Sequence, residues 1–162
     1  MDSGGGGGIF INYTGQDFSF PYLSNIIISN NYAENYGGGI VNDNGATPLL
    51  ENVLVINNSV SNTDGKGGGI YTSYVTSNMT LDNVTIQGNI ADQGSGVHSQ
   101  NSANVGINNS IIWNNSYNTN NRGFGQISLY ATQLTVSYSD IESGWEGTGN
   151  IDADPLFADT AN

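Results

Sequence analysis

Residues 37–40 read Gly-Gly-Gly-Ile, and the same four residues occur at 6–9 and again at 67–70. Weaker copies follow at residues 94–97, as Gly-Ser-Gly-Val, and at residues 124–127, as Phe-Gly-Gln-Ile. The apolar residue that ends each copy lies at 9, 40, 70, 97 and 127, in steps of 31, 30, 27 and 30 residues. Self-similarity at such a period identifies a repeat protein.

A second motif recurs in phase with the first. It reads Leu-Ser-Asn-Ile at 23–26, Leu-Glu-Asn-Val at 50–53, Leu-Asp-Asn-Val at 81–84 and Ile-Asn-Asn-Ser at 107–110, with a degenerate copy at 136–139. Short runs of β-branched residues alternate with polar ones between Gly and Asn clusters, which is typical of strands, and no window has a helical period. The repeats therefore predict an all-β, single-stranded parallel β-helix of about five coils, each of 27–31 residues.

The repeated residues have expected structural roles. We expect the glycines to turn a corner with positive φ and the following Ile to begin an inward-facing strand. One asparagine per coil recurs in the second motif, and these side chains should stack as a structural amide ladder: Asn25, Asn52, Asn83 and Asn109. A second asparagine column marks the next corner: Asn31, Asn58, Asn89 and Asn115.

Charge and composition exclude several classes of function. The net charge is −12, and the only basic residues are Lys66 and Arg122, so a nucleic-acid partner is not expected. Cations such as Ca²⁺ should be attracted, whereas acidic polysaccharides should be repelled unless a cation intervenes. There is no cysteine, and no apolar run is long enough for insertion into a membrane. The N-terminus lacks the basic and apolar regions of a signal peptide.

The combination of Gly-Gly-Gly-Ile with Leu-x-Asn-Val-x-Ile-x-x-Asn resembles the right-handed parallel β-helix repeats of secreted and surface bacterial proteins. These belong to the pectate-lyase-like superfamily and include the polymorphic outer-membrane-protein type. The stretch from Tyr138 through Phe157 is similar to the run that closes many such domains. The resemblance implies one right-handed β-helix domain over residues 1–162, a piece of a longer bacterial surface or extracellular protein, with 143–162 as a closing segment.

Outward-facing positions are the candidates for ligand binding. The first outward column after the glycines consists of Phe10, Val41, Tyr71, His98 and Ser128. Its aromatic and imidazole rings could pack on sugar faces. A second outward strip is apolar and includes Ile27, Leu54 and Trp113, which predicts that a loop of the same chain, a neighbouring domain or another copy covers it. The predicted binding residues are Phe10, Tyr71, His98 and Trp113.

Catalytic and metal sites have weaker support in the sequence. Glu51 and Asp82 occupy the same place on successive coils, about 5 Å apart, where paired carboxylates could act in a glycosidase or share a cation. His98 is the remaining catalytic candidate. The superfamily's polysaccharide lyases use Arg or Lys beside Ca²⁺-binding acids, but Lys66 and Arg122 have no such motif around them. Asp152, Asp154 and Asp159 are candidate Ca²⁺ ligands, although an Asp-Pro turn also explains them.

Three functions are therefore open. The favoured one is a non-enzymatic structural or binding module, adhesin-like or glycan-contacting, with a polysaccharide or cell-surface ligand and no obligatory cofactor. The first alternative is a polysaccharide-active lyase or glycoside hydrolase. The second is a solenoid that associates head to tail into a filament, because an open β-helix end exposes unpaired strand edges.

Overall fold

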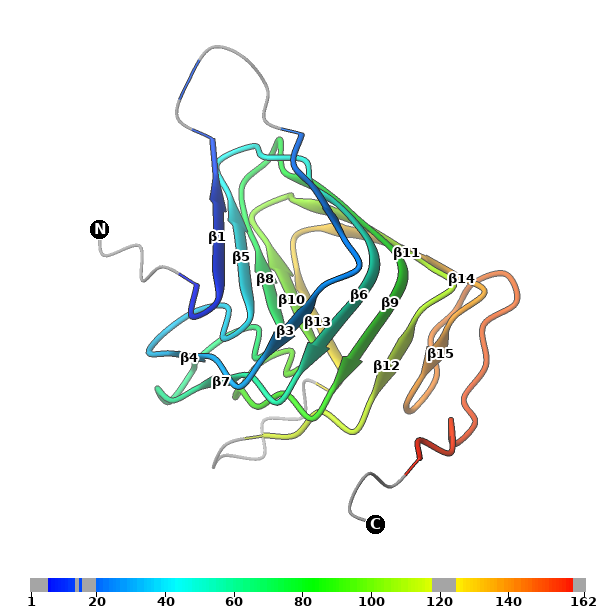
Figure 1. Cartoon of the computed structure of the whole chain (residues 1–162). Helices are drawn as coiled ribbons and strands as arrows, with labels where there is room; N and C mark the ends of the chain where they lie inside the picture. Colours follow the sequence, from blue (N-terminus) through cyan, green and yellow to red (C-terminus); the bar gives the residue numbers. More distant parts are fainter. Residues whose placement is uncertain (1–5, 14, 16–19, 118–124, 159–162) are drawn as a thin grey trace.

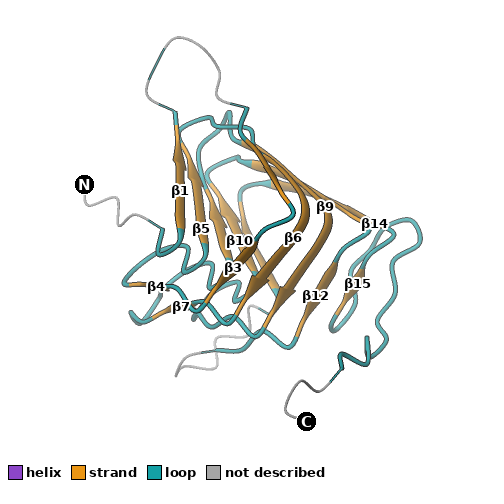
Figure 2. Ribbon diagram, in the orientation of Figure 1, coloured by secondary structure: helices purple, strands orange, loops and turns teal. Residues whose placement is uncertain are grey.

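The computed structural model describes residues 6–13, 15, 20–117 and 125–158, and these residues form a parallel β-solenoid (Figure 1). Within them the secondary structure consists of strands and connecting loops, with no helix (Figure 2). The chain makes about four complete turns. The prediction of about five coils was therefore slightly too high.

Three parallel sheets form the walls. Sheet A contains, in spatial order, β1 (Ile9–Asn12), β5 (Ile40–Asp43), β8 (Ile70–Thr72), β10 (Val97–Gln100) and β13 (Ile127–Tyr130). Sheet B contains β2 (Tyr22–Ser24), β3 (Ile27–Ser29), β6 (Leu49–Ile56), β9 (Asn78–Gln87), β11 (Asn104–Asn108), β12 (Ile111–Trp113), β14 (Gln133–Ser137) and β15 (Asp140–Ile141). Sheet C is the short pair β4 (Tyr32–Ala33) and β7 (Ser59–Val60).

The register confirms both repeated motifs. In sheet A, Ile40 pairs with Ile9 and Ile70, and the column continues through Val97 to Ile127. In sheet B, the corresponding column is Leu23, Leu50, Leu81, Ile107 and Val136. Each motif thus marks one turn of the solenoid.

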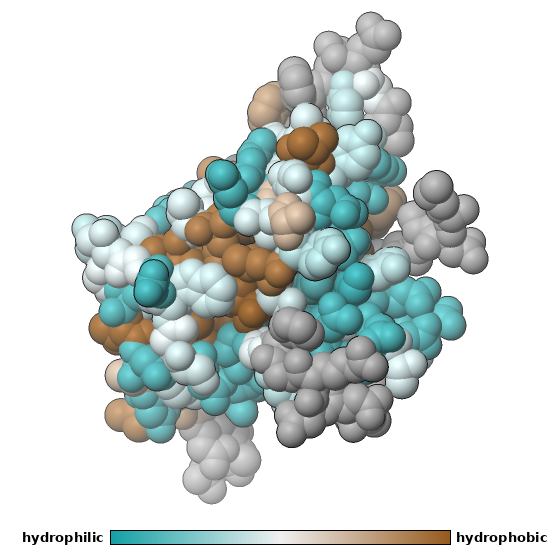
Figure 3. Space-filling model, turned by 180° about the vertical axis from the view of Figure 1, so that it is seen from behind, coloured by the Kyte–Doolittle hydropathy of each residue, from teal (hydrophilic) through white to brown (hydrophobic). Residues whose placement is uncertain are grey.

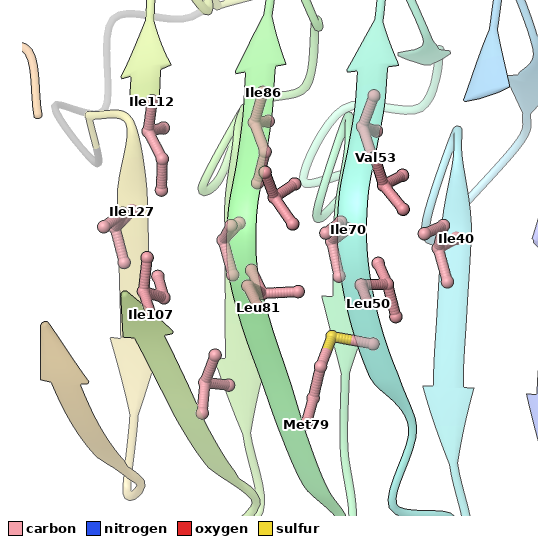
Figure 4. Close-up of a cluster of buried hydrophobic side chains, with 14 of the residues drawn as sticks. Ile40, Leu50, Val53, Ile70, Met79, Leu81, Ile86, Ile107, Ile112 and Ile127 are labelled. Carbon is pink, nitrogen blue, oxygen red and sulfur yellow. The ribbon is translucent and has the colours of Figure 1, made fainter. Parts of the chain in front are cut away.

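The core lies between the sheets and is built from these inward columns. Ile40, Ile70, Leu50, Leu81 and Ile107 are fully buried. Figure 4 shows their side chains pointing into the interior from neighbouring coils, so that residues of like shape stack along the solenoid. Contact between equivalent residues of successive coils explains why the sequence repeats aliphatic residues at this position.

Two positions of the glycine triplet require glycine, each for a separate structural reason. The first glycine of the second and third copies, Gly37 and Gly67, has φ of 55° and 66°, as expected for the corner. The second glycine is needed for close packing: a Cβ on Gly68 would lie 2.6 Å from the carbonyl oxygens of both Ile90 and Ser95. Adjacent backbones therefore approach too closely for any side chain.

The continuous amide ladder lies six residues beyond the predicted one. Asn31, Asn58 and Asn89 each donate Nδ2 to the Oδ1 of the next asparagine, at 2.9–3.0 Å, and the series ends at Asn115. Each backbone N–H donates to the same Oδ1 atom, at 2.9–3.0 Å. The column thus satisfies the buried polar groups of the corner between sheets B and C.

The asparagines predicted to form the ladder lie on the exposed surface instead. Asn25, Asn52, Asn83 and Asn109 have φ of 50–56°, a left-handed conformation that bends sheet B. One step of that column is hydrogen-bonded, from Asn83 Nδ2 to Asn52 Oδ1, whereas Asn109 Nδ2 donates to Asp82 Oδ1. The positive φ turns these side chains towards solvent, and asparagine accepts this conformation better than most residues do.

Candidate functional site

A row of three side chains covers the outward face of sheet A. Tyr36, Lys66 and Gln93 immediately precede the corner glycine in successive coils, and isolated parallel bridges join them in that order. The turn that carries them leaves sheet C and passes beside sheet A before the next strand begins (Figure 1). The outward column of sheet A is therefore not open to solvent along its whole length.

The aromatic rings of that column are buried in a stack. Tyr71 is 6% exposed and His98 is 1% exposed. Tyr36 stacks on Tyr71 with ring centroids 4.8 Å apart, and Tyr71 stacks on His98 at 5.8 Å with an interplanar angle of 7°. Because the ring faces contact one another, Tyr71 and His98 do not offer the flat sugar-binding platform expected from the sequence. Phe10, at the start of the same column, is exposed.

Polar side chains fix the position of this stack. Gln100 Nε2 donates to the Tyr71 hydroxyl at 2.7 Å, and Lys66 Nζ donates to Gln100 Oε1 at 3.0 Å. His98 Nε2 lies 3.3 Å from the same Gln100 oxygen, which assigns the imidazole proton to Nε2. His98 Nδ1 is then a buried acceptor, and it has no hydrogen-bond partner among the residues that the structure describes.

Burial determines the charge state of both rings. It lowers the pKa of His98 to about 4; the hydrogen bond to Gln100 raises the pKa and the Lys66 charge lowers it, both by less than burial does. Burial also raises the pKa of Tyr71 to about 12. Both rings are therefore neutral at pH 7, and His98 is a weak base, which makes it a poor candidate for a catalytic base at that pH.

A pocket of about 250 Å³ lies beside the stack. Its lining includes Lys66, Gln93, His98 and Gln100, together with Ser128 and Tyr130 of β13. Sequence reasoning missed Gln93, Gln100 and Tyr130. For Gln93 the usable signal was its place before the corner glycine, since this position recurs in phase with the repeat.

The paired carboxylates lie on a different surface. Glu51 and Asp82 are cross-strand neighbours on the outward face of sheet B, as their spacing predicted. Each carboxylate accepts a hydrogen bond, Glu51 from the Tyr22 hydroxyl and Asp82 from Asn109 Nδ2. These bonds leave both groups as ordinary surface acceptors. Their proposed role in catalysis stays a prediction.

The C-terminal acidic residues act locally in the backbone. Asp152 Oδ1 accepts the N–H of Ser143 at 3.2 Å, and Asp154 Oδ1 accepts the N–H of Leu156 at 2.9 Å. Asp159 lies outside the described residues. In the part of the chain that the structure describes, no group of three His, Asp or Glu side chains could hold a metal ion. Calcium binding by these residues stays a prediction.

Sheet B carries an exposed apolar strip on its outward face. Ile27 and Leu54 are neighbours across β3 and β6, and Tyr22 and Leu49 are neighbours across β2 and β6. Tyr22 is 60% exposed and Ile27 is 65% exposed, while Trp113, further along the sheet, is half-buried. We call Tyr22, Ile27, Leu49 and Leu54 the sheet B strip.

Comparison with known proteins agrees with this architecture. Residues 2–141 match the model of the family described as the right-handed β-helix region. The chain belongs to the right-handed β-helix family. This β-helix matches no curated protein and no solved structure. Among the described residues there is no helix long and apolar enough to cross a membrane.

Proposed function

We propose that this β-helix is a non-enzymatic binding module that contacts a polysaccharide or cell-surface ligand through the sheet B strip. The observation that carries the proposal is the exposure of two apolar cross-strand pairs, Tyr22 with Leu49 and Ile27 with Leu54, on the outward face of sheet B. Exposed apolar side chains that gather on one face of a sheet are a frequent mark of an interaction site. Tyr22 adds an aromatic face, which suits the apolar side of a sugar ring.

The location and the wider family are part of the same proposal. The repeat motifs support a place among secreted or surface bacterial proteins of the pectate-lyase-like superfamily, close to the polymorphic outer-membrane-protein type. The absence of cysteine is compatible with either an oxidising or a reducing compartment. The net charge of −12 favours a neutral ligand, or an acidic one bridged by Ca²⁺.

The test is binding of purified protein to glycan arrays and to bacterial and host cells, with and without Ca²⁺. Ile27→Ser should weaken binding, because it removes the most exposed aliphatic side chain of the strip. Val75→Ser is the matched control, since Val75 is 60% exposed but lies in a turn after β8. Absence of binding to every glycan and cell surface would refute the proposal. An equal loss of binding in Ile27→Ser and Val75→Ser would show that the ligand does not bind specifically at the sheet B strip.

Polysaccharide cleavage is the alternative, and the pairing of Glu51 with Asp82 is the one observation in its favour. Glu51→Gln and Asp82→Asn should each abolish any hydrolysis that these carboxylates perform. Cleavage that survives both substitutions would exclude these two residues.

A further inference from the structure

The pocket beside the aromatic stack contains the only cation that the structure describes. Lys66 is one of two basic residues in a chain of net charge −12, and Arg122 lies outside the described residues. In the described part of the chain, the Lys66 ammonium is paired with a neutral amide oxygen, Gln100 Oε1, rather than with a carboxylate. With 14 acidic residues available, a lysine left without an acidic partner is unexpected.

Among the residues that the structure describes, the ammonium is held in place but not saturated. An ammonium group has three N–H donors, and the bond to Gln100 uses one of them. Gln100 is itself fixed by the Tyr71 hydroxyl, and Tyr71 is fixed between Tyr36 and His98. The charge is thus positioned through a chain of partly buried contacts. Such preorganisation lowers the cost of binding an anion.

The rest of the pocket is neutral and mixed in polarity. His98 is uncharged at pH 7, and Gln93, Gln100 and Ser128 supply amide and hydroxyl groups. Tyr130 is 70% exposed and forms an aromatic wall. A volume of about 250 Å³ accommodates one sugar ring or one amino acid. The pocket therefore offers a single positive charge beside a ring-sized surface.

We propose that this pocket binds a small molecule that carries one carboxylate, with the carboxylate on Lys66 and the rest of the molecule against Tyr130. The shared chemistry is the carboxylate, which an acidic monosaccharide or an acylated amino acid would both supply. The site lies on sheet A, whereas the sheet B strip lies on another wall. The two proposals can therefore fail separately.

The experiment titrates the intact protein with two matched pairs of probes, followed by NMR and calorimetry. Glucuronate is compared with glucose, and N-acetylglycine with N-acetylglycinamide, so that within each pair the carboxylate is the intended difference. Both acids, or one of them, should shift the His98 Cε1–H and Tyr130 ring signals saturably, and the neutral partners should not. The pair that responds identifies the source of the carboxylate.

Variants test the assignment of residues. Lys66→Gln should weaken binding about tenfold or more, which is the loss expected for one charged hydrogen bond. Lys66→Arg keeps the charge and should retain binding, which separates loss of charge from loss of folding. Tyr130→Ala should weaken binding, whereas Tyr138→Ala, at a tyrosine with 64% exposure between β14 and β15, should not. Equal response to neutral probes, or unchanged binding by Lys66→Gln, would overturn the proposal.

Discussion

Replacing Asn89 with alanine should destabilise the solenoid strongly, because the side chain connects three coils. Its Oδ1 accepts the backbone N–H of Asn58 at 2.9 Å and Asn58 Nδ2 at 3.0 Å. Its Nδ2 donates to Asn115 Oδ1 at 2.9 Å and to the carbonyl of Val55 at 2.8 Å. Asn58 and Asn89 are fully buried, so water does not replace these partners in the folded state.

The size of the effect follows from the groups left without partners. In Asn89→Ala the backbone N–H of Asn58 and one N–H of its Nδ2 group both lose their acceptor, Asn89 Oδ1. Each such buried group costs about 1–3 kcal/mol. With the lost donation to Val55, the expected loss is about 3–5 kcal/mol in the free energy of unfolding, a large part of the typical total of about 5–15 kcal/mol.

Urea denaturation followed by the fluorescence of Trp113 and Trp145 measures this loss. Asn31→Ala is the matched control, since Asn31 is the first asparagine of the same ladder, is only half-buried and donates to Asn58 without accepting from another ladder asparagine. We expect a loss of about 1 kcal/mol for Asn31→Ala. If Asn89→Ala costs no more than Asn31→Ala, the ladder does not stabilise the fold as argued.

Two further predictions concern single positions. Gly68→Ala should destabilise by about 2 kcal/mol or more, since its Cβ would collide with two carbonyl oxygens. Gly106→Ala should be nearly neutral, because the one atom within 4 Å of a Cβ there is Thr135 Oγ1 at 3.7 Å; equal unfolding midpoints of the two variants would refute this. In the folded protein His98 stays neutral down to a pH of about 4, whereas in the unfolded chain it binds a proton below about 6.5. The free energy of unfolding therefore decreases as the pH is lowered through this window, by about 2 kcal/mol from pH 8 to pH 5. His98→Gln should lack this contribution, and parallel pH–stability curves for the two proteins would contradict the assignment.

The sequence predicted the fold because two motifs recur in phase. Residues equivalent to Ile40 and Leu50 are required once per coil by the core, and glycine is required where backbones touch, so both leave a periodic record. The sequence does not distinguish which asparagine column forms the buried ladder. Asn52 and Asn58 both recur once per coil, but the backbone of Asn52 has a positive φ and that of Asn58 does not, a difference that residue type does not reveal. In the fifth coil Tyr138 has the left-handed φ of the exposed column and is itself exposed.

The candidate sites were harder to predict for a different reason. Alternation along β8 and β10 correctly places Tyr71 and His98 on the outward face of sheet A. It contains no information on what covers that face. The covering residues, such as Tyr36, come from a turn whose path depends on the corner between sheets C and A. Periodicity within a strand therefore predicts direction but not exposure.

The way in which the ladder ends also bears on head-to-tail association. At the C-terminal side Gln126 takes the place of a further asparagine: its Oε1 accepts the N–H of Asn115 at 3.1 Å, and its Nε2 donates to the Asn115 carbonyl at 3.0 Å and to Glu142 Oε2 at 2.6 Å. Because both ends of this amide are engaged, another copy would have to break these bonds to continue the ladder.

Exposed apolar surface, in contrast, favours head-to-tail association. The inward Leu129 and Leu134 of the fifth coil are only partly buried, and Figure 3 shows an apolar area near the middle of the face turned away from Figure 1. Each copy carries a net charge of −12, however, so stacking also brings like charges together. We therefore expect a monomer at low ionic strength, measured by light scattering at increasing protein concentration. Filaments at low salt would show that end burial outweighs both the Gln126 contacts and the charge, whereas association only at high salt would identify charge repulsion as the barrier.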